Sequence, residues 1–184
     1  RLWPDETAPV VESVTDDQAV ELGVKFVASE VGSVTGVRFY KGALNTGTHV
    51  GSLWAADGSL LAQATFDAES AAGWQQVLFS QPVARRPGAT YVASYRAPAG
   101  GYAATVGGLR DAVVRGPLTA PAGVSGTSPN GVYLYGAPGM PTNGSDTNYW
   151  VDVVYSTSGA PAGTSSPTAV AAGADVPTAT RYLR

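Results

Sequence analysis

The chain has 184 residues, of which 11 are basic and 14 acidic, and its formal net charge is −3. It contains no cysteine and one histidine, which excludes disulfides, thiolate metal sites and imidazole-based zinc sites within one chain. Because its lysines and arginines do not cluster, we expect neither nucleic acid nor an anionic lipid surface as a partner. Its apolar stretches are too short for membrane insertion.

Alternation with a period of two residues predicts an all-β fold. In residues 20–26, Val20, Leu22 and the apolar residues that follow share one face, whereas Glu21 and Lys25 share the other, as in a half-buried strand. No window of about a dozen residues sustains the spacing of an amphipathic helix. Similar alternation predicts further strands at residues 34–41, 51–55, 60–66, 74–79, 90–96, 131–135 and 148–155.

Turn signals separate these strands. Asp57-Gly58 is a strong hairpin signal, because both residues tolerate a positive φ. Pro87-Gly88 and Asn130-Gly131 mark two more turns, and we expect one long connection or irregular edge strands in residues 100–129. About eight short strands at this spacing predict a two-sheet antiparallel β-sandwich of the jelly-roll or Ig-like type.

The composition changes near residue 157. Residues 157–184 are rich in Ser, Thr, Pro and Ala and poor in large apolar side chains. Such a segment cannot bury enough apolar area to offset its chain entropy. We therefore predict a β-sandwich module at residues 1–156, followed at residues 157–184 by a flexible linker or the start of another module.

Several ordered motifs resemble a bacterial family described as a domain of unknown function, number 4082. They include Leu2-Trp3-Pro4 and lie at residues 2–4, 20–26, 36–41, 45–49, 51–54, 90–95, 130–133 and 148–153. The resemblance covers about residues 2–155 and implies a β-sandwich module of secreted, multi-domain proteins. Neighbouring domains in such proteins are often Ig-like, fibronectin-like or carbohydrate-active, which suggests glycan binding or wall attachment. The family brings no catalytic residues that could be transferred to this chain.

Surface aromatic residues are the candidates for glycan binding, because flat rings stack on sugar faces while polar side chains bond the hydroxyls. Trp54 follows the inward-pointing Leu53 and is expected to face outward, whereas Trp150 is expected in the core. Each of these rings could instead close the core or the rim of a sheet. The candidate ligand-binding residues are Trp54, Tyr40, Arg38, His49, Tyr133 and Tyr135.

A calcium site is a second hypothesis. If the strand of Glu21 pairs with the strand of Asp152, the two carboxylates protrude on one polar face, and a bound Ca²⁺ would offset their repulsion. The alternative pairs Glu21 with Lys25, and Asp152 with an arginine or a backbone amide. Apart from this structural Ca²⁺, no cofactor is expected.

Catalysis is not favoured by the sequence. His49, expected in a loop, is the only base available to a Ser–His–Asp arrangement, and no Gly-x-Ser-x-Gly motif is present. The sequence therefore predicts a secreted or cell-surface, non-catalytic accessory module that binds polysaccharide or cell-wall glycan beside neighbouring domains of the same chain. A structural spacer or adhesin-type module is the alternative, and a glycan-cleaving enzyme with a carboxylate pair is less favoured.

Overall fold

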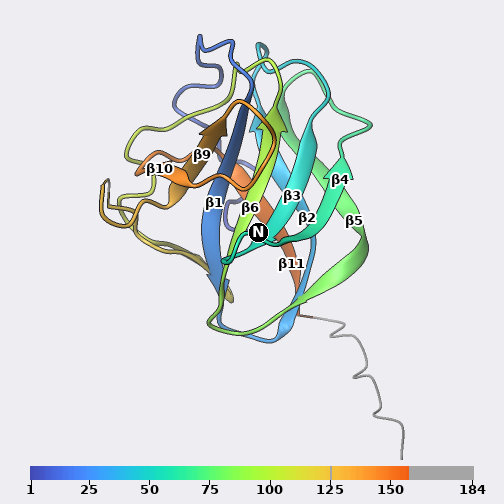
Figure 1. Ribbon diagram of the computed structural model, residues 1–184, viewed down its shortest axis with the longest axis vertical. Coiled ribbons are helices and arrows are strands. Elements are labelled where there is room, and N and C mark those ends of the chain that lie inside the picture. Colours follow the sequence, from blue (N-terminus) through green and yellow to red (C-terminus); the bar gives the residue numbers. More distant parts are fainter. Residues whose placement is uncertain (125, 158–184) are drawn as a thin grey trace, which may run out of the picture.

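In a computed structural model that describes residues 1–124 and 126–157, the chain forms two antiparallel sheets packed face to face (Figure 1). The described residues contain no helix, so the predicted all-β sandwich is confirmed. Accordingly, none of them belongs to a helix that could span a membrane. The predicted linker lies outside the described residues, apart from residue 157.

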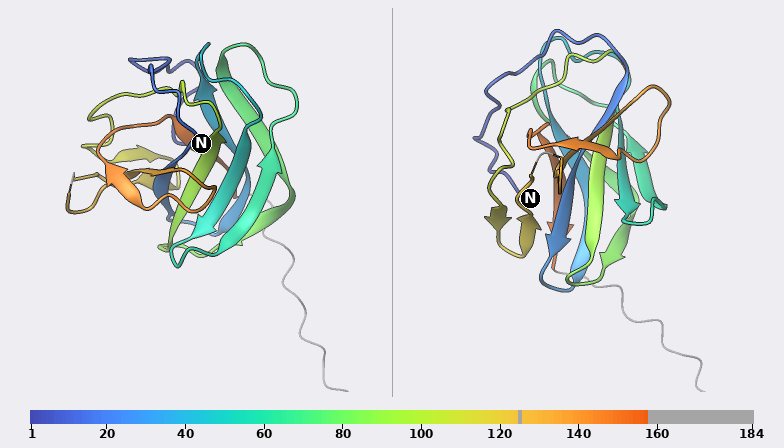
Figure 2. Two further views of the ribbon diagram at one scale, coloured as in Figure 1. Left: turned by 45° about the horizontal axis from the view of Figure 1, so that its top comes forward. Right: turned by 60° about the vertical axis from the view of Figure 1, so that its left-hand side comes forward.

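The larger sheet has eight strands, with the order β10-β9-β1-β6-β3-β4 and with β8 joining the end of β1 and β7 joining β8. The smaller sheet has the order β11-β2-β5 and lies behind the larger one in Figures 1 and 2. The strands are β1 (Val20–Ala28), β2 (Gly32–Lys41), β3 (Val50–Ala55), β4 (Leu60–Thr65), β5 (Gly73–Arg85), β6 (Thr90–Ala97), β7 (Val113–Arg115), β8 (Leu118–Ala120), β9 (Gly131–Tyr135), β10 (Asn143–Ser145) and β11 (Val151–Ser156).

The core lies between the two sheets and is built from the alternating apolar residues of both. The larger sheet contributes Leu22 and Phe26 of β1, and the smaller sheet contributes Phe39 of β2 and Val153 of β11. The ring of Phe39 stacks on Tyr95 of β6 with 4.0 Å between centroids. Removal of these apolar faces from water is the main stabilising contribution to such a sandwich.

The predicted strands are all present; most ends differ by three residues or fewer, whereas β5 continues to Arg85, six residues beyond its predicted end. Asp57-Gly58 forms the β3–β4 hairpin, in which Gly58 has a φ of 92° and the Ala55 amide donates to the Ser59 carbonyl at 2.9 Å. Residues 100–129 hold the short strands β7 and β8. Asn130-Gly131 does not form a hairpin turn, because β9 begins at Gly131.

Each outer face of the sandwich is partly covered by an irregular segment. Residues 1–7, here called the N-terminal strap, lie on the smaller sheet, where the Leu2 amide donates to Asp152 and the Trp74 indole donates to the Thr7 carbonyl. Residues 136–142, the β9–β10 loop, cross β1 and β6 of the larger sheet (Figure 1). The N-terminal strap buries Arg38 of the smaller sheet, whereas a pocket remains beneath the β9–β10 loop on the larger sheet.

Candidate functional site

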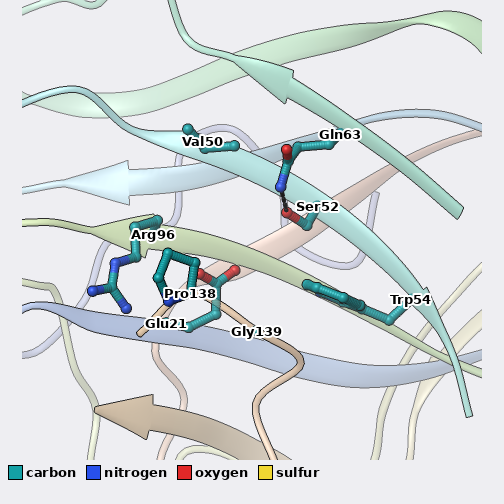
Figure 3. A pocket seen from close by; sticks show the side chains of 8 residues that line it. All are labelled: Glu21, Val50, Ser52, Trp54, Gln63, Arg96, Pro138 and Gly139. Atoms are coloured by element: carbon teal, nitrogen blue, oxygen red, sulfur yellow. Dashed lines mark hydrogen bonds between the residues drawn. The ribbon is translucent and has the colours of Figure 1, made fainter. Parts of the chain in front are cut away.

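A pocket of about 310 Å³ opens on the outer face of the larger sheet. It follows from the strand register, because every second residue of a strand points to the same face. Glu21 of β1 lies opposite Arg96 of β6, and Ser52 of β3 lies opposite Gln63 of β4. We call this the outer-face pocket, lined by Glu21, Val50, Ser52, Trp54, Gln63, Arg96, Pro138 and Gly139 (Figure 3).

Trp54 forms one wall of this pocket. Its ring packs against Val92 of β6, Val132 of β9 and Met140 of the β9–β10 loop. This packing leaves the residue 9% exposed. It therefore faces outward from the core, as predicted, but it is a pocket wall and not an open surface platform. A hydrogen bond of 2.8 Å from its indole Nε1 to Ser94 Oγ holds the ring in place.

Glu21 continues the same hydrogen-bond chain. Ser94 Oγ donates to Glu21 Oε1 at 2.6 Å, so Trp54, Ser94 and Glu21 are linked in series. The side chain is 2% exposed, and this burial raises the pKa of Glu21 to about 7, although the Ser94 hydrogen bond and Arg96 act in the opposite direction. The carboxyl group thus changes its protonation state near neutral pH.

Arg96 lies across the sheet from Glu21 without forming an ion pair with it among the described residues. Its Nη2 donates to the Gly136 carbonyl, which fastens the β9–β10 loop to β6. Its Nη1 is buried and has no hydrogen-bond acceptor in the part of the chain that the structure describes. A buried cationic donor without a partner is costly, and the side chain to which it belongs lines the pocket.

Gln63 completes the polar lining at the rim of the pocket. Its Nε2 donates to Ser52 Oγ at 3.1 Å, and the residue itself is exposed. Figure 3 shows Arg96 at one end of the pocket and Trp54 at the other, with the Glu21 carboxyl and Pro138 between them. The pocket therefore combines an apolar ring with carboxyl, guanidinium and amide groups.

Tyr133 and Tyr135 share a face, as predicted, but they line a different pocket. Their ring centroids are 5.9 Å apart in an edge-to-face arrangement. The Tyr135 hydroxyl donates to Asp16, and this hydrogen bond holds the pKa of Asp16 below its usual value. We call this second pocket, of about 290 Å³, the tyrosine hollow, lined by Leu22, Tyr102, Tyr133, Tyr135, Ser145, Thr147 and Tyr149.

Tyr40 and Arg38 lie on the outer face of the smaller sheet. Arg38 is 2% exposed beneath the N-terminal strap, donates from Nε to Asp152 Oδ2 at 2.9 Å, and places its guanidinium 4.0 Å from the centre of the Trp74 ring. Tyr40 packs edge to face against Trp74 and Trp150. Alternation correctly gives their direction, but the strap removes Arg38 from the surface. Trp150 is buried, as expected.

His49 lies in the loop between β2 and β3, as predicted, but it does not serve as a surface ligand-binding residue. The side chain is fully buried, with Nδ1 2.7 Å from Glu69 Oε1 and Nε2 2.8 Å from Asn45 Oδ1. Its ring also lies 4.8 Å from that of Phe39. Burial lowers the pKa of His49, with Glu69 acting in the opposite direction. His49 is therefore part of the interior and cannot reach a ligand hydroxyl.

The strand pairing behind the calcium hypothesis is also wrong. Glu21 lies in β1, which pairs with β6 and β9, whereas Asp152 lies in β11, which pairs with β2. The two carboxylates therefore belong to different sheets and point to opposite outer faces. Asp152 bonds Arg38 and the amides of Leu2 and Trp3. No cluster of three or more His, Cys, Asp or Glu suited to a metal occurs within residues 1–124 and 126–157.

Sequence reasoning did not identify Arg96, Gln63 and Ser52 as site residues. Alternation within their own strands gives the face on which each one lies. It does not give the neighbouring strand, and Glu21 and Arg96 are brought together across 74 intervening positions. The signal that could have found them is the set of polar residues at alternate positions of β3, β4 and β6, combined with the correct strand order.

The comparisons with known proteins give one family. The sequence profile of a family described as "Domain of unknown function (DUF4082)" matches residues 6–151. The match includes all eight lining residues of the outer-face pocket. No curated protein matches the chain.

Proposed function

The chain belongs to the DUF4082 family, and we propose that this member is a secreted, non-catalytic accessory module that binds polysaccharide through the outer-face pocket. One observation supports this proposal more than any other. The indole of Trp54 shares a single pocket with the carboxyl of Glu21, the guanidinium of Arg96 and the amide of Gln63.

This combination matches the two chemical sides of a sugar. A pyranose ring presents an apolar C–H face, which packs on an aromatic ring, and a rim of hydroxyls that both donate and accept hydrogen bonds. Arg96 supplies donors, Glu21 supplies an acceptor, and the Gln63 amide supplies both. Pockets that bind small molecules typically have this mixture of apolar walls and a few fixed polar groups.

The dimensions favour one sugar residue over an extended chain. A pocket of about 310 Å³ is at the lower end of the range for small-molecule sites. Trp54 offers only the part of its ring that Met140 and its neighbours leave uncovered. We therefore expect the module to bind chain ends or side branches of a glycan and not a flat crystalline surface.

The outer-face pocket is a better candidate than the tyrosine hollow. In the hollow, the phenol rings contact one another edge to face, and the hydroxyls of Tyr102, Tyr135 and Tyr149 already bond one another, Asp16 or Ser145. In the outer-face pocket, Arg96 Nη1 has no such partner among the described residues. Unsatisfied polar groups favour a ligand, whereas satisfied ones stabilise the fold.

The number of carboxyl groups in the pocket favours binding of a glycan over its cleavage. Glycoside hydrolysis generally uses a pair of carboxyl groups on the two sides of the scissile bond. Of the eight residues that line the pocket, Glu21 alone carries a carboxyl group. A single carboxyl at this position is suited to bonding a hydroxyl.

Affinity electrophoresis through gels containing soluble polysaccharides tests this function. Gln63→Ala removes an amide from the rim without disturbing the core. We expect the glycans that retain the wild-type protein to retain this variant more weakly. Gln81→Ala is the matched control, because Gln81 is an exposed residue of β5 on the smaller sheet. Trp54→Ala should abolish retention, with its folding checked by circular dichroism.

Two results would contradict this function. If the wild-type protein is retained by no glycan of a broad panel, the spacer or adhesin-type alternative replaces it. If retention occurs but Gln63→Ala and Trp54→Ala leave it unchanged, the binding surface lies elsewhere. Secretion belongs to the same proposal, and detection of the full-length protein in the culture medium or on the cell surface tests it.

A further inference from the structure

The outer-face pocket has an unusual arrangement of charge. Glu21 and Arg96 are directly opposite each other on β1 and β6, where an ion pair would normally form. Arg96 instead donates through Nη2 to the Gly136 carbonyl, and its Nη1 remains buried without an acceptor among the described residues. Glu21 uses Oε1 to accept from Ser94. A guanidinium and a carboxyl group thus face the same pocket without a hydrogen bond between them.

A guanidinium in this position matches a planar oxyanion better than a single hydroxyl. The N–H groups of arginine lie in one plane and match the two oxygens of a carboxylate, with shorter and stronger hydrogen bonds than those to neutral groups. The remaining lining residues, Val50, Ser52, Trp54, Gln63, Pro138 and Gly139, are uncharged. Arg96 therefore sets the charge that the pocket selects whenever Glu21 is protonated.

We propose that the sugar residue bound in the outer-face pocket carries a carboxylate, as uronic and sialic acids do, and that the guanidinium of Arg96 is its principal partner. This inference rests on the proposed function and specifies its ligand class. The protonated carboxyl of Glu21 donates a second hydrogen bond to the same carboxylate. The apolar part of the sugar packs on Trp54 at the other end of the pocket (Figure 3).

The second hydrogen bond makes binding depend on pH. Glu21 is buried, and its pKa of about 7 keeps it largely protonated in mildly acidic solution. Above that pH, an ionised Glu21 repels the ligand carboxylate. Arg96 is the charged group that faces Glu21 from β6, and β3, β4 and the β9–β10 loop contribute no charged lining residue. On β1 itself, Lys25 lies on the same face, two alternate positions further along.

The decisive experiment compares each acidic polysaccharide with its own neutral form. Polygalacturonate, alginate, hyaluronan and polysialic acid are each tested beside a carboxyl-reduced counterpart, by titration calorimetry at pH 6. We expect at least one acidic form to bind about tenfold or more tightly than its counterpart, as a charge-assisted hydrogen bond implies. Equal affinity for the two forms of every glycan would overturn the inference.

Two variants assign the preference to Arg96. Arg96→Gln removes the charge and should abolish the difference between acidic and reduced forms. Arg96→Lys keeps the charge but loses the planar donor group, so it should retain only part of the difference. Arg110→Gln, at an exposed arginine that pairs with Asp146, is the matched control and should behave as wild type. A preference that survives Arg96→Gln would contradict the proposal.

Glu21→Gln tests the pH dependence separately. In the wild-type protein, affinity for the acidic glycan should fall about tenfold between pH 6 and pH 8, because binding requires the proton on Glu21. The amide of Glu21→Gln donates a hydrogen bond at every pH, so its affinity should stay near the pH 6 value. The same pH profile in both proteins would overturn the role of Glu21.

The outcomes separate this inference from the function on which it rests. If neutral glycans are retained in a way that depends on Trp54, without preference for an acidic form, glycan binding would be supported and the proposed carboxylate-bearing ligand would be contradicted. Absence of binding to every acidic and neutral glycan would remove both.

Discussion

The two outer faces of the sandwich carry similar side chains in different states of pairing. On the smaller sheet, Arg38 contacts Asp152, Asp5 and the Trp3 carbonyl and lies over the ring of Trp74. Every charge in this group has a partner within the chain. The N-terminal strap covers the group and is held by it.

On the larger sheet, the corresponding residues are Arg96, Glu21 and Trp54. Here the arginine and the carboxyl lie opposite each other without bonding each other in the described part of the chain, and both line a pocket beneath the β9–β10 loop. Residue type therefore does not distinguish a stabilising cluster from a binding site. The distinction comes from whether the hydrogen-bonding capacity is used within the chain.

The largest effect should come from Asp152→Ala on the smaller sheet. This change removes the buried carboxylate that pairs with the guanidinium of Arg38 and frees two backbone amides of the strap. Removal of one partner from a buried ion pair typically costs about 3–5 kcal/mol. We expect the free energy of unfolding, measured by urea denaturation at pH 7, to fall by that amount. A loss below about 1 kcal/mol would contradict the view that this cluster stabilises the fold.

An effect of opposite sign is expected at Glu21 on the larger sheet. The pKa of Glu21 rises from 4.5 to about 7 on folding, so its contribution to stability is complete below about pH 4.5 and is lost as the pH rises through 7. The loss amounts to about 3 kcal/mol at pH 8. Glu21→Gln should therefore be more stable than wild type at pH 8, with little difference at pH 4.5. Stability is measured by urea denaturation of both proteins at each pH. Subtracting the wild-type values from those of Glu21→Gln removes the contribution of His49, whose pKa is also shifted but which is present in both proteins.

We expect the smallest changes in the free energy of unfolding from a matched pair of arginine substitutions, one on each sheet. Arg38→Lys loses the two-point contact with Asp152 and the stacking on Trp74, which should cost about 1–2 kcal/mol. Arg96→Lys should change stability by no more than about 0.5 kcal/mol, because its guanidinium has few partners within the chain. Thermal denaturation of both variants measures the contrast, and equal losses would remove the distinction between the two faces.

The sequence predicts the strands and the direction of many side chains, because both follow from local alternation. Trp54 and Arg38 do point away from the core, and Asp57-Gly58 does form a hairpin. The sequence pattern of a strand does not predict which distant segment covers a residue that points outward from that strand. Arg38 is buried by a strap about 35 positions away in the chain, and Trp54 by a loop more than 80 positions away.

Strand partnership was the second source of error. The calcium hypothesis paired the first and last predicted strands, whereas the structure places them in different sheets. His49 lies in a loop between two strands, as the sequence predicts, but the alternation pattern does not show that its side chain is buried against Glu69 and Asn45. The wrong strand pairing concerns segments whose order in space depends on the whole sandwich and on no single strand.

Nuclear magnetic resonance of the four tryptophan indoles tests the central claim most directly. Trp3, Trp74 and Trp150 form one cluster on the smaller sheet, whereas Trp54 lies alone in the outer-face pocket. During titration with a retained glycan, we expect the Trp54 Nε1–H signal to shift with saturation while the other three signals stay in place. Saturable shifts in the cluster of three, with no change at Trp54, would contradict it.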